Sequence, residues 1–128
     1  MGLRPGDVGL PLSLPGGDVR LYLDAIPEAD QLFQKLMTEV PWKHEHIMLF
    51  GKRQAMPRLT CWMGDATYTY SGLTNVPAPW NESVQRIRDA AEEFSGTNFN
   101  GVLLNLYRDG RDSMGWHADD EATLGSNP

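Results

Sequence analysis

The stretch that decides the fold reads LLNLYRDGRDSMGWHADDE and covers residues 103–121. It runs from apolar residues through a turn-forming sequence to His117-Ala-Asp119. Side chains at positions i and i+2 of an extended strand point to the same side, so this imidazole and this carboxylate are expected to lie together. A histidine and a carboxylate are two of the three protein ligands in the facial triad of non-haem Fe(II) sites. The stretch therefore predicts a strand that carries part of an iron site.

Short strands separated by turns account for much of the remaining chain. The apolar run at residues 99–107 predicts a long strand that leads into the turn at Arg108. Further strands are predicted at residues 19–23, 44–50, 58–63 and 66–70. Gly51 and Gly64-Asp65 mark the turns that end two of them.

Two amphipathic helices are also predicted. The first opens at Pro27, where a missing N–H is harmless, and Pro41 ends it. Its apolar residues follow the helical period and are Ala29, Leu32, Phe33, Leu36, Met37 and Val40. The second has Asn81 as its N-cap and closes at Gly96. Its apolar face consists of Val84, Ile87, Ala91 and Phe94. Helices followed by strands indicate an α+β fold, with the helices laid on one face of a sheet.

Composition limits the class of protein. With 128 residues, 41% of them hydrophobic, the chain is expected to form a single soluble domain or most of one. One cysteine excludes an internal disulfide and favours a reducing compartment, so we expect a cytoplasmic location, or a nuclear one in a eukaryote. The sequence contains no signal peptide or membrane-spanning run, and we expect no membrane partner. The net charge of −6 opposes non-specific adhesion to nucleic acid but does not exclude a local basic patch.

Residues 99–121 resemble the AlkB family of Fe(II)/2-oxoglutarate dioxygenases, and the resemblance extends back to about Lys43. It implies an α+β fold with a double-stranded β-helix (jelly-roll) core and the two helices packed on the sheet. The implied layout is a loose leader at 1–17 and one domain at 18–128, with a nucleotide-recognition lid at about 43–72 and the start of the jelly-roll core at about 98–128.

The resemblance implies an oxidative dealkylase that acts on N-alkylated bases in DNA or RNA. It would use Fe(II), O2 and the cosubstrate 2-oxoglutarate, and release formaldehyde, succinate and CO2. His117 and Asp119 are the implied catalytic metal ligands, and Asn105 and Tyr107 are the implied donors to the 2-oxoglutarate carboxylates. Without the resemblance, the same residues indicate a solvated turn and an ordinary strand.

Leu49-Phe50-Gly51-Lys52 resembles the finger of AlkB relatives that act on duplexes. Its apolar tip at Phe50 and Gly51 would fill the gap that a flipped base leaves. Lys52, with Arg53 and Arg58 nearby, would contact phosphates. A hairpin turn with Phe50 buried is the structural alternative.

The lid residues Tyr68 and Tyr70 share one face of a predicted strand. The resemblance implies that they stack on a flipped base, and core packing of one of them is the alternative. Asp120 and Glu121 follow the metal motif directly and would contact a cationic N-alkyl base. A solvated acidic turn is the alternative for these two.

In the AlkB family, a second metal histidine and an arginine that binds the far carboxylate of 2-oxoglutarate lie downstream of this motif. No candidate for either follows Asp119. We therefore expect a domain that is incomplete at its C-terminus and inactive alone, and that is completed by the missing part of the same domain or by a second copy. Two other function classes stay open: a catalytically incomplete structural or nucleic-acid-binding module, and an oxygenase with a substrate other than nucleic acid.

Some residues that invite a functional interpretation are expected to be structural. His44-Glu-His46 lacks a clear third ligand, so we interpret both histidines as exposed strand residues. Cys61 lies in an apolar strand and is expected to be a buried thiol. The methionines expected to fill the core are Met37, Met48 and Met63.

Overall fold

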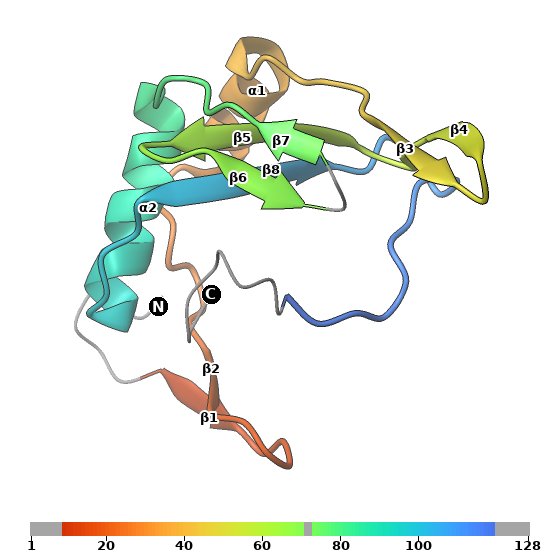
Figure 1. Ribbon diagram of the computed structural model, residues 1–128. Coiled ribbons are helices and arrows are strands. Elements are labelled where there is room, and N and C mark those ends of the chain that lie inside the picture. The colour runs from red at the N-terminus through yellow and green to blue at the C-terminus, as the bar shows by residue number, and fades with distance from the viewer. Residues whose placement is uncertain (1–8, 71–72, 120–128) are drawn as a thin grey trace. The chain divides into compact units, whose positions relative to one another are not determined.

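The computed structural model describes residues 9–70 and 73–119. Its elements are, in chain order, β1 (Leu10–Leu12), β2 (Val19–Leu21), α1 (Ala29–Glu39), β3 (His46–Leu49), β4 (Lys52–Ala55), β5 (Leu59–Gly64), β6 (Tyr68–Tyr70), β7 (Leu73–Asn75), α2 (Glu82–Ser95) and β8 (Gly101–Leu106) (Figure 1). The strands pair antiparallel as β1–β2, β3–β4, β5–β8 and β6–β7. Helices together with antiparallel strands agree with the expected α+β class.

The described residues divide into two compact units. Unit 1 contains the residues up to Glu39 together with 81–99, and unit 2 contains 40–80 together with the residues from Asn100 onward. Both helices and the β1–β2 hairpin belong to unit 1, and the other strands belong to unit 2.

Helix α2 has the two ends that its sequence predicts. Asn81 is extended, and its side-chain oxygen accepts a hydrogen bond of 2.8 Å from the N–H of Val84. Gly96 is left-handed at a φ of 68°, and its N–H donates to the carbonyl oxygen of Glu92. No helix in the described part of the chain is long and apolar enough to cross a lipid bilayer.

Helix α1 buries only part of its predicted apolar stripe. Leu32 is buried, whereas Phe33 and Met37 are exposed, so the expectation that Met37 fills the core is wrong. The helical period decides which residues share a face, but a face is buried only where another element covers it. Within unit 1, an ion pair of 3.0 Å between Arg86 and Glu28 links α2 to the start of α1.

The β1–β2 hairpin includes a strand that the sequence does not predict. Strand β2 lies where a strand is expected, but β1 lies in the stretch expected to be a loose leader. Leu10 pairs with Leu21, and Leu12 pairs with Val19. Just after β2, Tyr22 packs against Phe94 of α2 with 4.6 Å between the ring centroids.

The β5–β8 pair forms the centre of unit 2. Its register runs from Leu59 opposite Leu106 to Gly64 opposite Gly101. Cys61 and Met63 lie on one face of this pair and are among the most buried side chains described. Both are therefore core residues, as expected from the sequence.

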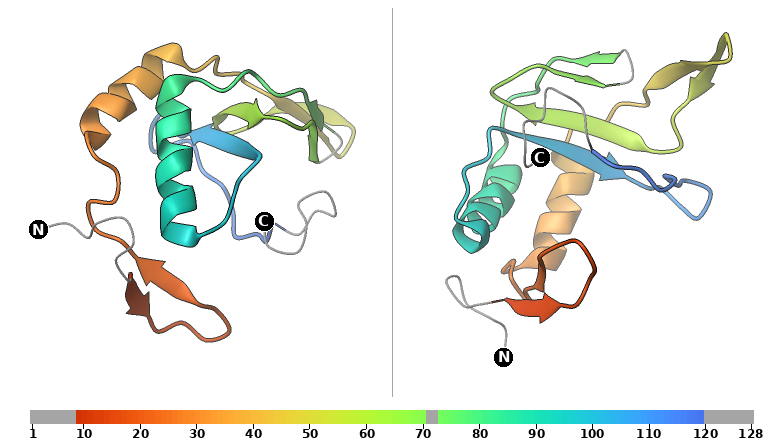
Figure 2. Two further views of the ribbon diagram at one scale, coloured as in Figure 1. Left: turned by 90° about the vertical axis from the view of Figure 1, so that its left-hand side faces the viewer. Right: turned by 60° about the horizontal axis from the view of Figure 1, so that its bottom comes forward.

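The β3–β4 hairpin extends beyond the β5–β8 pair (Figures 1 and 2). Its register places Leu49 opposite Lys52, which leaves Phe50 and Gly51 as a two-residue turn. Their φ angles are 49° and 74°, both positive, as a type I′ hairpin turn requires. Phe50 is therefore held in the left-handed region, which a bulky residue rarely adopts.

Gly64 lies where two backbones approach closely at the end of the β5–β8 pair. Its φ is 151°, and a Cβ atom built there would lie 2.5 Å from the carbonyl oxygen of Asn100 and 2.6 Å from the Cα of Gly101. The Asp65 N–H also donates to that Asn100 oxygen at 2.8 Å. Both the Asn100 oxygen and the Gly101 Cα are backbone atoms, so neither can move aside without distorting the strand pair.

Substituting Gly64→Ala is expected to lower the free energy of unfolding by about 2–4 kcal/mol, through backbone strain and overpacking. Urea unfolding followed by circular dichroism measures this change. Gly110→Ala is the matched control, because a Cβ there meets nothing within 4 Å. Equal urea midpoints for the two variants would show that β5 and β8 can move apart at Gly64 without a loss of stability.

Candidate functional site

The segment after β8 carries the predicted metal ligands but is not a strand. The chain from Tyr107 to Asp119 forms turns and irregular structure, with a bend at Trp116. The expectation that His117 and Asp119 lie on a strand is therefore wrong. A strand needs a neighbour for its N–H and C=O groups, and no strand of the described residues pairs with this segment.

His117 and Asp119 nevertheless lie side by side. Nε2 of His117 is 3.5 Å from Oδ1 of Asp119, and both side chains are partly exposed. Nδ1 of His117 lies 2.8 Å from the carbonyl oxygen of Gly115. Because a carbonyl oxygen can only accept, Nδ1 carries the proton of this hydrogen bond, and Nε2 is the ring nitrogen that faces Asp119.

Between β8 and His117 the chain folds into a turn closed by ion pairs. The carboxylate of Asp112 accepts from Nε and Nη2 of Arg108 at 2.7 and 2.9 Å, and from the Arg108 backbone N–H at 2.9 Å. A second pair joins Arg111 to Asp109, with a shortest distance of 2.7 Å. The sequence predicted a turn at Arg108 but not the ion pairs that close it, although their signal is the alternation of arginine and aspartate at residues 108–112.

The two ion pairs of this turn differ in exposure. The Asp112 side chain is 7% exposed, whereas that of Arg111 is 90% exposed. Hydrogen bonds from the side chain and backbone of Arg108 lower the pKa of Asp112 to about 2. Asp112 is therefore a carboxylate at any ordinary working pH.

Asn105 and Tyr107, the expected 2-oxoglutarate donors, directly precede the turn. Asn105 lies on β8 opposite Thr60, on the face away from Cys61, and it is exposed. Tyr107 follows the last residue of β8 and is also exposed. Both residues are thus open to solvent in the described structure.

The expected finger is the tip of the β3–β4 hairpin. Phe50 is 103% exposed, so the alternative of a hairpin turn with Phe50 buried is wrong. Lys52 and Arg53 begin β4 and are exposed beside it. Met48 is 66% exposed, so the expectation that it fills the core is wrong as well. A two-stranded hairpin has no second layer to cover either face.

Arg58 differs from the other cations that are expected to contact phosphates. Only 4% of it is exposed, in contrast to Lys52 and Arg53. A buried guanidinium is poorly placed to reach a phosphate, so this burial fits a structural role better than the expected contact. The residue directly precedes β5, which forms the centre of unit 2.

Other expected base-contacting residues are described only in part. The backbone of β6 places Tyr68 and Tyr70 two positions apart, hence on one side of the strand, but their side chains lie outside what the structure describes. Asp120 and Glu121 follow the last described residue, and their positions are likewise outside the description.

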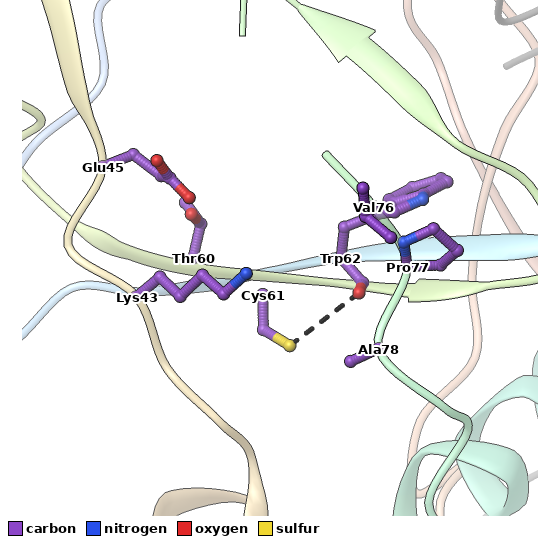
Figure 3. A pocket seen from close by; sticks show the side chains of 8 residues that line it. All are labelled: Lys43, Glu45, Thr60, Cys61, Trp62, Val76, Pro77 and Ala78. Atoms are coloured by element: carbon purple, nitrogen blue, oxygen red, sulfur yellow. Dashed lines mark hydrogen bonds between the residues drawn. The ribbon is translucent and has the colours of Figure 1, made fainter. Parts of the chain in front are cut away.

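A cavity of about 250 Å³ lies at the outer edge of β5 (Figure 3). Lys43 pairs with Thr60 at one end of it, and Ala78 donates to the Trp62 carbonyl oxygen at the other. Burial raises the pKa of the Cys61 thiol that lines it, and the charge of Lys43 offsets this only in part. The thiol is therefore protonated and unreactive at neutral pH.

The two histidines expected to be exposed strand residues fit that expectation only in part: His46 begins β3 but is half-buried, and His44 is exposed but lies two residues before the strand. Nε2 of His44 lies 2.8 Å from the carbonyl oxygen of Met56, to which it donates. The rings of His44 and His46 are 5.5 Å apart. His44 thus serves to join the two ends of the β3–β4 hairpin.

A sequence profile described as the 2OG-Fe(II) oxygenase superfamily matches residues 20–128. The chain belongs to this superfamily. Within the superfamily, the match to AlkB relatives confirms the AlkB resemblance of the metal motif.

The curated relatives of this superfamily member include two kinds of AlkB homologue. The chain is 41% identical to alpha-ketoglutarate-dependent dioxygenase alkB homolog 3 of Bos taurus, over 80% of this chain and 36% of the relative. It is 45% identical to DNA oxidative demethylase ALKBH2 of Homo sapiens, over 76% of this chain and 39% of the relative. The chain therefore spans little more than a third of the length of these relatives.

The residues of this superfamily member fit the Fe(II) that the superfamily name implies. Bonds from a divalent ion to nitrogen or oxygen ligands are about 2.0–2.2 Å long, so two ligands of one ion lie about 3–3.5 Å apart. The separation of 3.5 Å between His117 and Asp119 matches this range. The hydrogen bond from Nδ1 to Gly115 is the support that metal-binding histidines usually have. Among the described residues, no group of three or more His, Cys, Asp or Glu side chains could hold a metal ion.

Substituting His117→Ala is expected to weaken divalent metal binding by more than about 100-fold, because a direct ligand contributes more than its supporting contacts do. Calorimetric titration with Mn(II), a redox-inert substitute for Fe(II), measures the affinity. His46→Ala is the control, since it removes a histidine of β3 that is not part of the metal motif. Unchanged affinity in His117→Ala would exclude this histidine as a ligand.

Proposed function

We propose that this protein oxidatively dealkylates N-alkylated bases in DNA or RNA. The reaction consumes O2 and 2-oxoglutarate and releases formaldehyde, succinate and CO2. The observation that carries the proposal is the His117–Asp119 pair, with its Nε2–Oδ1 distance of 3.5 Å, in a chain of the 2OG-Fe(II) oxygenase superfamily. One relative is named a DNA oxidative demethylase, which supports nucleic acid as the substrate class.

Fe(II) with 2-oxoglutarate, when bound, supplies the oxidation of the N-alkyl carbon by O2. Nε2 of His117 and the carboxylate of Asp119 hold the ion. The Nδ1–H bond to Gly115 keeps the imidazole ring turned so that Nε2 faces the same space as Asp119. The exposure of both side chains leaves room beside them for a cosubstrate and a substrate.

Asn105 and Tyr107 bind the carboxylates of 2-oxoglutarate. A dianion that leaves water needs directed donors, and an amide and a phenol supply neutral ones that need no counter-charge. Their exposure and their position just before the ion-paired turn support this assignment. In this arrangement β8 carries the cosubstrate donors, and the segment after it carries the metal ligands.

The β3–β4 hairpin and strand β6 contact the nucleic acid. Phe50 projects from the hairpin tip as an apolar wedge that fills the place of a flipped base, with Gly51 allowing the tight turn. Lys52 and Arg53 lie beside it and contact phosphates, a local basic patch in a chain of net charge −6. We do not extend this role to Arg58, because it is buried.

The flipped base itself is held by residues near the metal. Tyr68 and Tyr70 stack on it, and Asp120 and Glu121 lie close to its cationic ring. An anion stabilises the charge of an N-alkylated base, which favours the damaged base over a neutral one.

The finer fold that we propose is the jelly roll of the superfamily. In it, β8 belongs to the jelly-roll core and residues 43–72 to the lid. The β5–β8 register joins these two parts through a continuous ladder, so the lid is connected to the core by backbone hydrogen bonds. This connection supports a lid that is fixed at its β5 end.

The direct test is an assay of formaldehyde and succinate with an oligonucleotide that carries an N-methylated base. Equal amounts of the two products, dependent on Fe(II) and 2-oxoglutarate, are expected from a form that spans the length of the curated relatives, and Asp119→Ala in that form should abolish both. The 128-residue chain alone is expected to be inactive. Turnover of a methylated peptide instead would show that the chemistry is right and the substrate class wrong.

Tyr107→Phe is expected to raise the KM for 2-oxoglutarate about tenfold to a hundredfold, because one hydrogen bond to a carboxylate is worth about 1.5–3 kcal/mol. Mn(II) affinity should change little. Steady-state kinetics and calorimetry measure the two quantities. Tyr22→Phe is the control, since Tyr22 packs against Phe94 in unit 1. A wild-type KM with lost stability would instead make Tyr107 a core residue.

Phe50→Ala is expected to slow dealkylation of a duplex at least about tenfold more than that of a single strand. Only a duplex leaves a gap to be filled, and unstacking costs a few kcal/mol. The ratio of kcat/KM on the two substrates measures the effect. Met48→Ala is the matched control, because it removes another exposed apolar side chain of the same hairpin. Equal losses on both substrates would contradict the wedge.

A further inference from the structure

The turn at residues 108–112 separates the residues proposed to bind 2-oxoglutarate from those proposed to bind iron. Tyr107 directly precedes it, and His117 follows it. We propose that Asp112 is a positioning residue, which closes this turn on Arg108 and thereby sets where His117 lies relative to Tyr107. This inference rests on the proposed function and assigns a role to a residue outside the metal and cosubstrate sites.

The contacts of Asp112 hold the backbone, not only a side chain. Oδ2 accepts from the Arg108 backbone N–H at 2.9 Å and from Nε at 2.7 Å, and Oδ1 accepts from Nη2 at 2.9 Å. Both oxygens of one carboxylate are thus engaged by one residue. The Asp112 N–H also donates to the carbonyl oxygen of Asp109 at 3.1 Å. The turn is closed through main chain and side chain together.

The start of the turn is itself fixed. Leu106 is the last residue of β8 and pairs with Leu59 of β5, so Arg108 lies only two residues beyond an anchored strand. Asp112 is therefore held against the end of the sheet. Beyond it, the described chain to Asp119 makes no strand pair. Among the described contacts, Asp112 is the last residue before His117 that hydrogen-bonds back to the end of β8.

Charge and burial make this carboxylate hard to replace. Its side chain is 7% exposed, and it is ionised at any working pH because its pKa is lowered to about 2. Charge-assisted hydrogen bonds are shorter and stronger than neutral ones. An amide at this position has one acceptor oxygen in place of two, and its NH2 group would face the Arg108 donors.

The neighbouring pair Asp109–Arg111 provides a matched comparison. It has similar short contacts, of 2.7 and 3.2 Å from the Arg111 guanidinium and 2.9 Å from the Arg111 backbone N–H, but it joins residues two apart and its arginine is 90% exposed. Surface ion pairs of this kind contribute little. The Asp109–Arg111 pair also does not link the turn back to the end of β8. The two pairs share chemistry and location and differ in whether they tie the turn to the end of β8.

A displacement of a ligand by about 1 Å is enough to lose much of a site's affinity or rate. Calorimetric titration with Mn(II), at saturating 2-oxoglutarate, distinguishes this effect from a loss of folding. A misplaced ligand raises Kd and leaves the number of sites unchanged. Partial unfolding lowers the number of sites and leaves Kd of the folded fraction unchanged.

Asp112→Asn is expected to raise the Kd for Mn(II) about 10–100-fold at unchanged stoichiometry, the range seen when a group that orients a metal ligand is removed. Arg108→Gln should have a smaller effect, because its backbone N–H still reaches Asp112. Asp109→Asn should leave Kd within about twofold of the wild type, as expected for a surface pair.

Three results would overturn the inference. Wild-type Kd in Asp112→Asn would leave the metal site intact and remove the positioning role. Reduced stoichiometry alone would make Asp112 a stability residue. Equal effects of Asp112→Asn and Asp109→Asn would deny any special role to the closure on Arg108. The proposed function fails separately if His117→Ala binds Mn(II) as tightly as the wild-type protein does. That result would overturn the inference as well.

Discussion

The antiparallel ladder between β5 and β8 is the constraint on which unit 2 depends. It joins Leu59–Gly64 to Gly101–Leu106 across a long stretch of intervening chain, and it buries Cys61 and Met63 on one face. At one end, Gly64 and Gly101 approach too closely for a side chain at Gly64. At the other end, Asn105 lies on β8 itself, and the chain that leaves the ladder contains Tyr107, His117 and Asp119, the other described candidates for iron and cosubstrate binding. The main-chain hydrogen bonds of the β5–β8 ladder therefore fix where the candidate site begins.

Electrostatics then shape the segment that leaves the ladder. Opposite charges alternate through residues 108–112 and pair locally, so the turn carries no net charge. The imidazole of His117 is oriented by a backbone carbonyl and not by an acidic side chain. Asp119 is the acidic group nearest to Nε2 among the described contacts, which is what the proposed sharing of a cation by the two residues requires.

Local signals in the sequence predicted local structure well. Asn81 and Gly96 end α2 as expected, the strand predicted at 58–63 covers all of β5 except Gly64, and the strand predicted at 99–107 contains β8. Long-range effects were harder to predict. The pairing of β5 with β8 is not encoded in either strand alone, and the burial of Arg58 and the exposure of Met48 depend on which elements cover them. For the site, the spacing predicted that His117 and Asp119 meet, but the expected strand is absent, because two residues can approach in a turn as well as on a pleat.

The backbone conformation of Phe50 has a consequence for how stability and activity are related. A φ of 49° costs a phenylalanine about 1–2 kcal/mol that a glycine would not lose. Because the ring is fully exposed, the fold regains none of this energy through packing. The hairpin would thus be more stable with a glycine at residue 50, and selection for thermal stability alone would tend to remove the phenylalanine. Directed evolution of this chain toward heat resistance should therefore include a selection for activity. Without it, replacing Phe50 would raise stability, because the folded state gains nothing from that side chain.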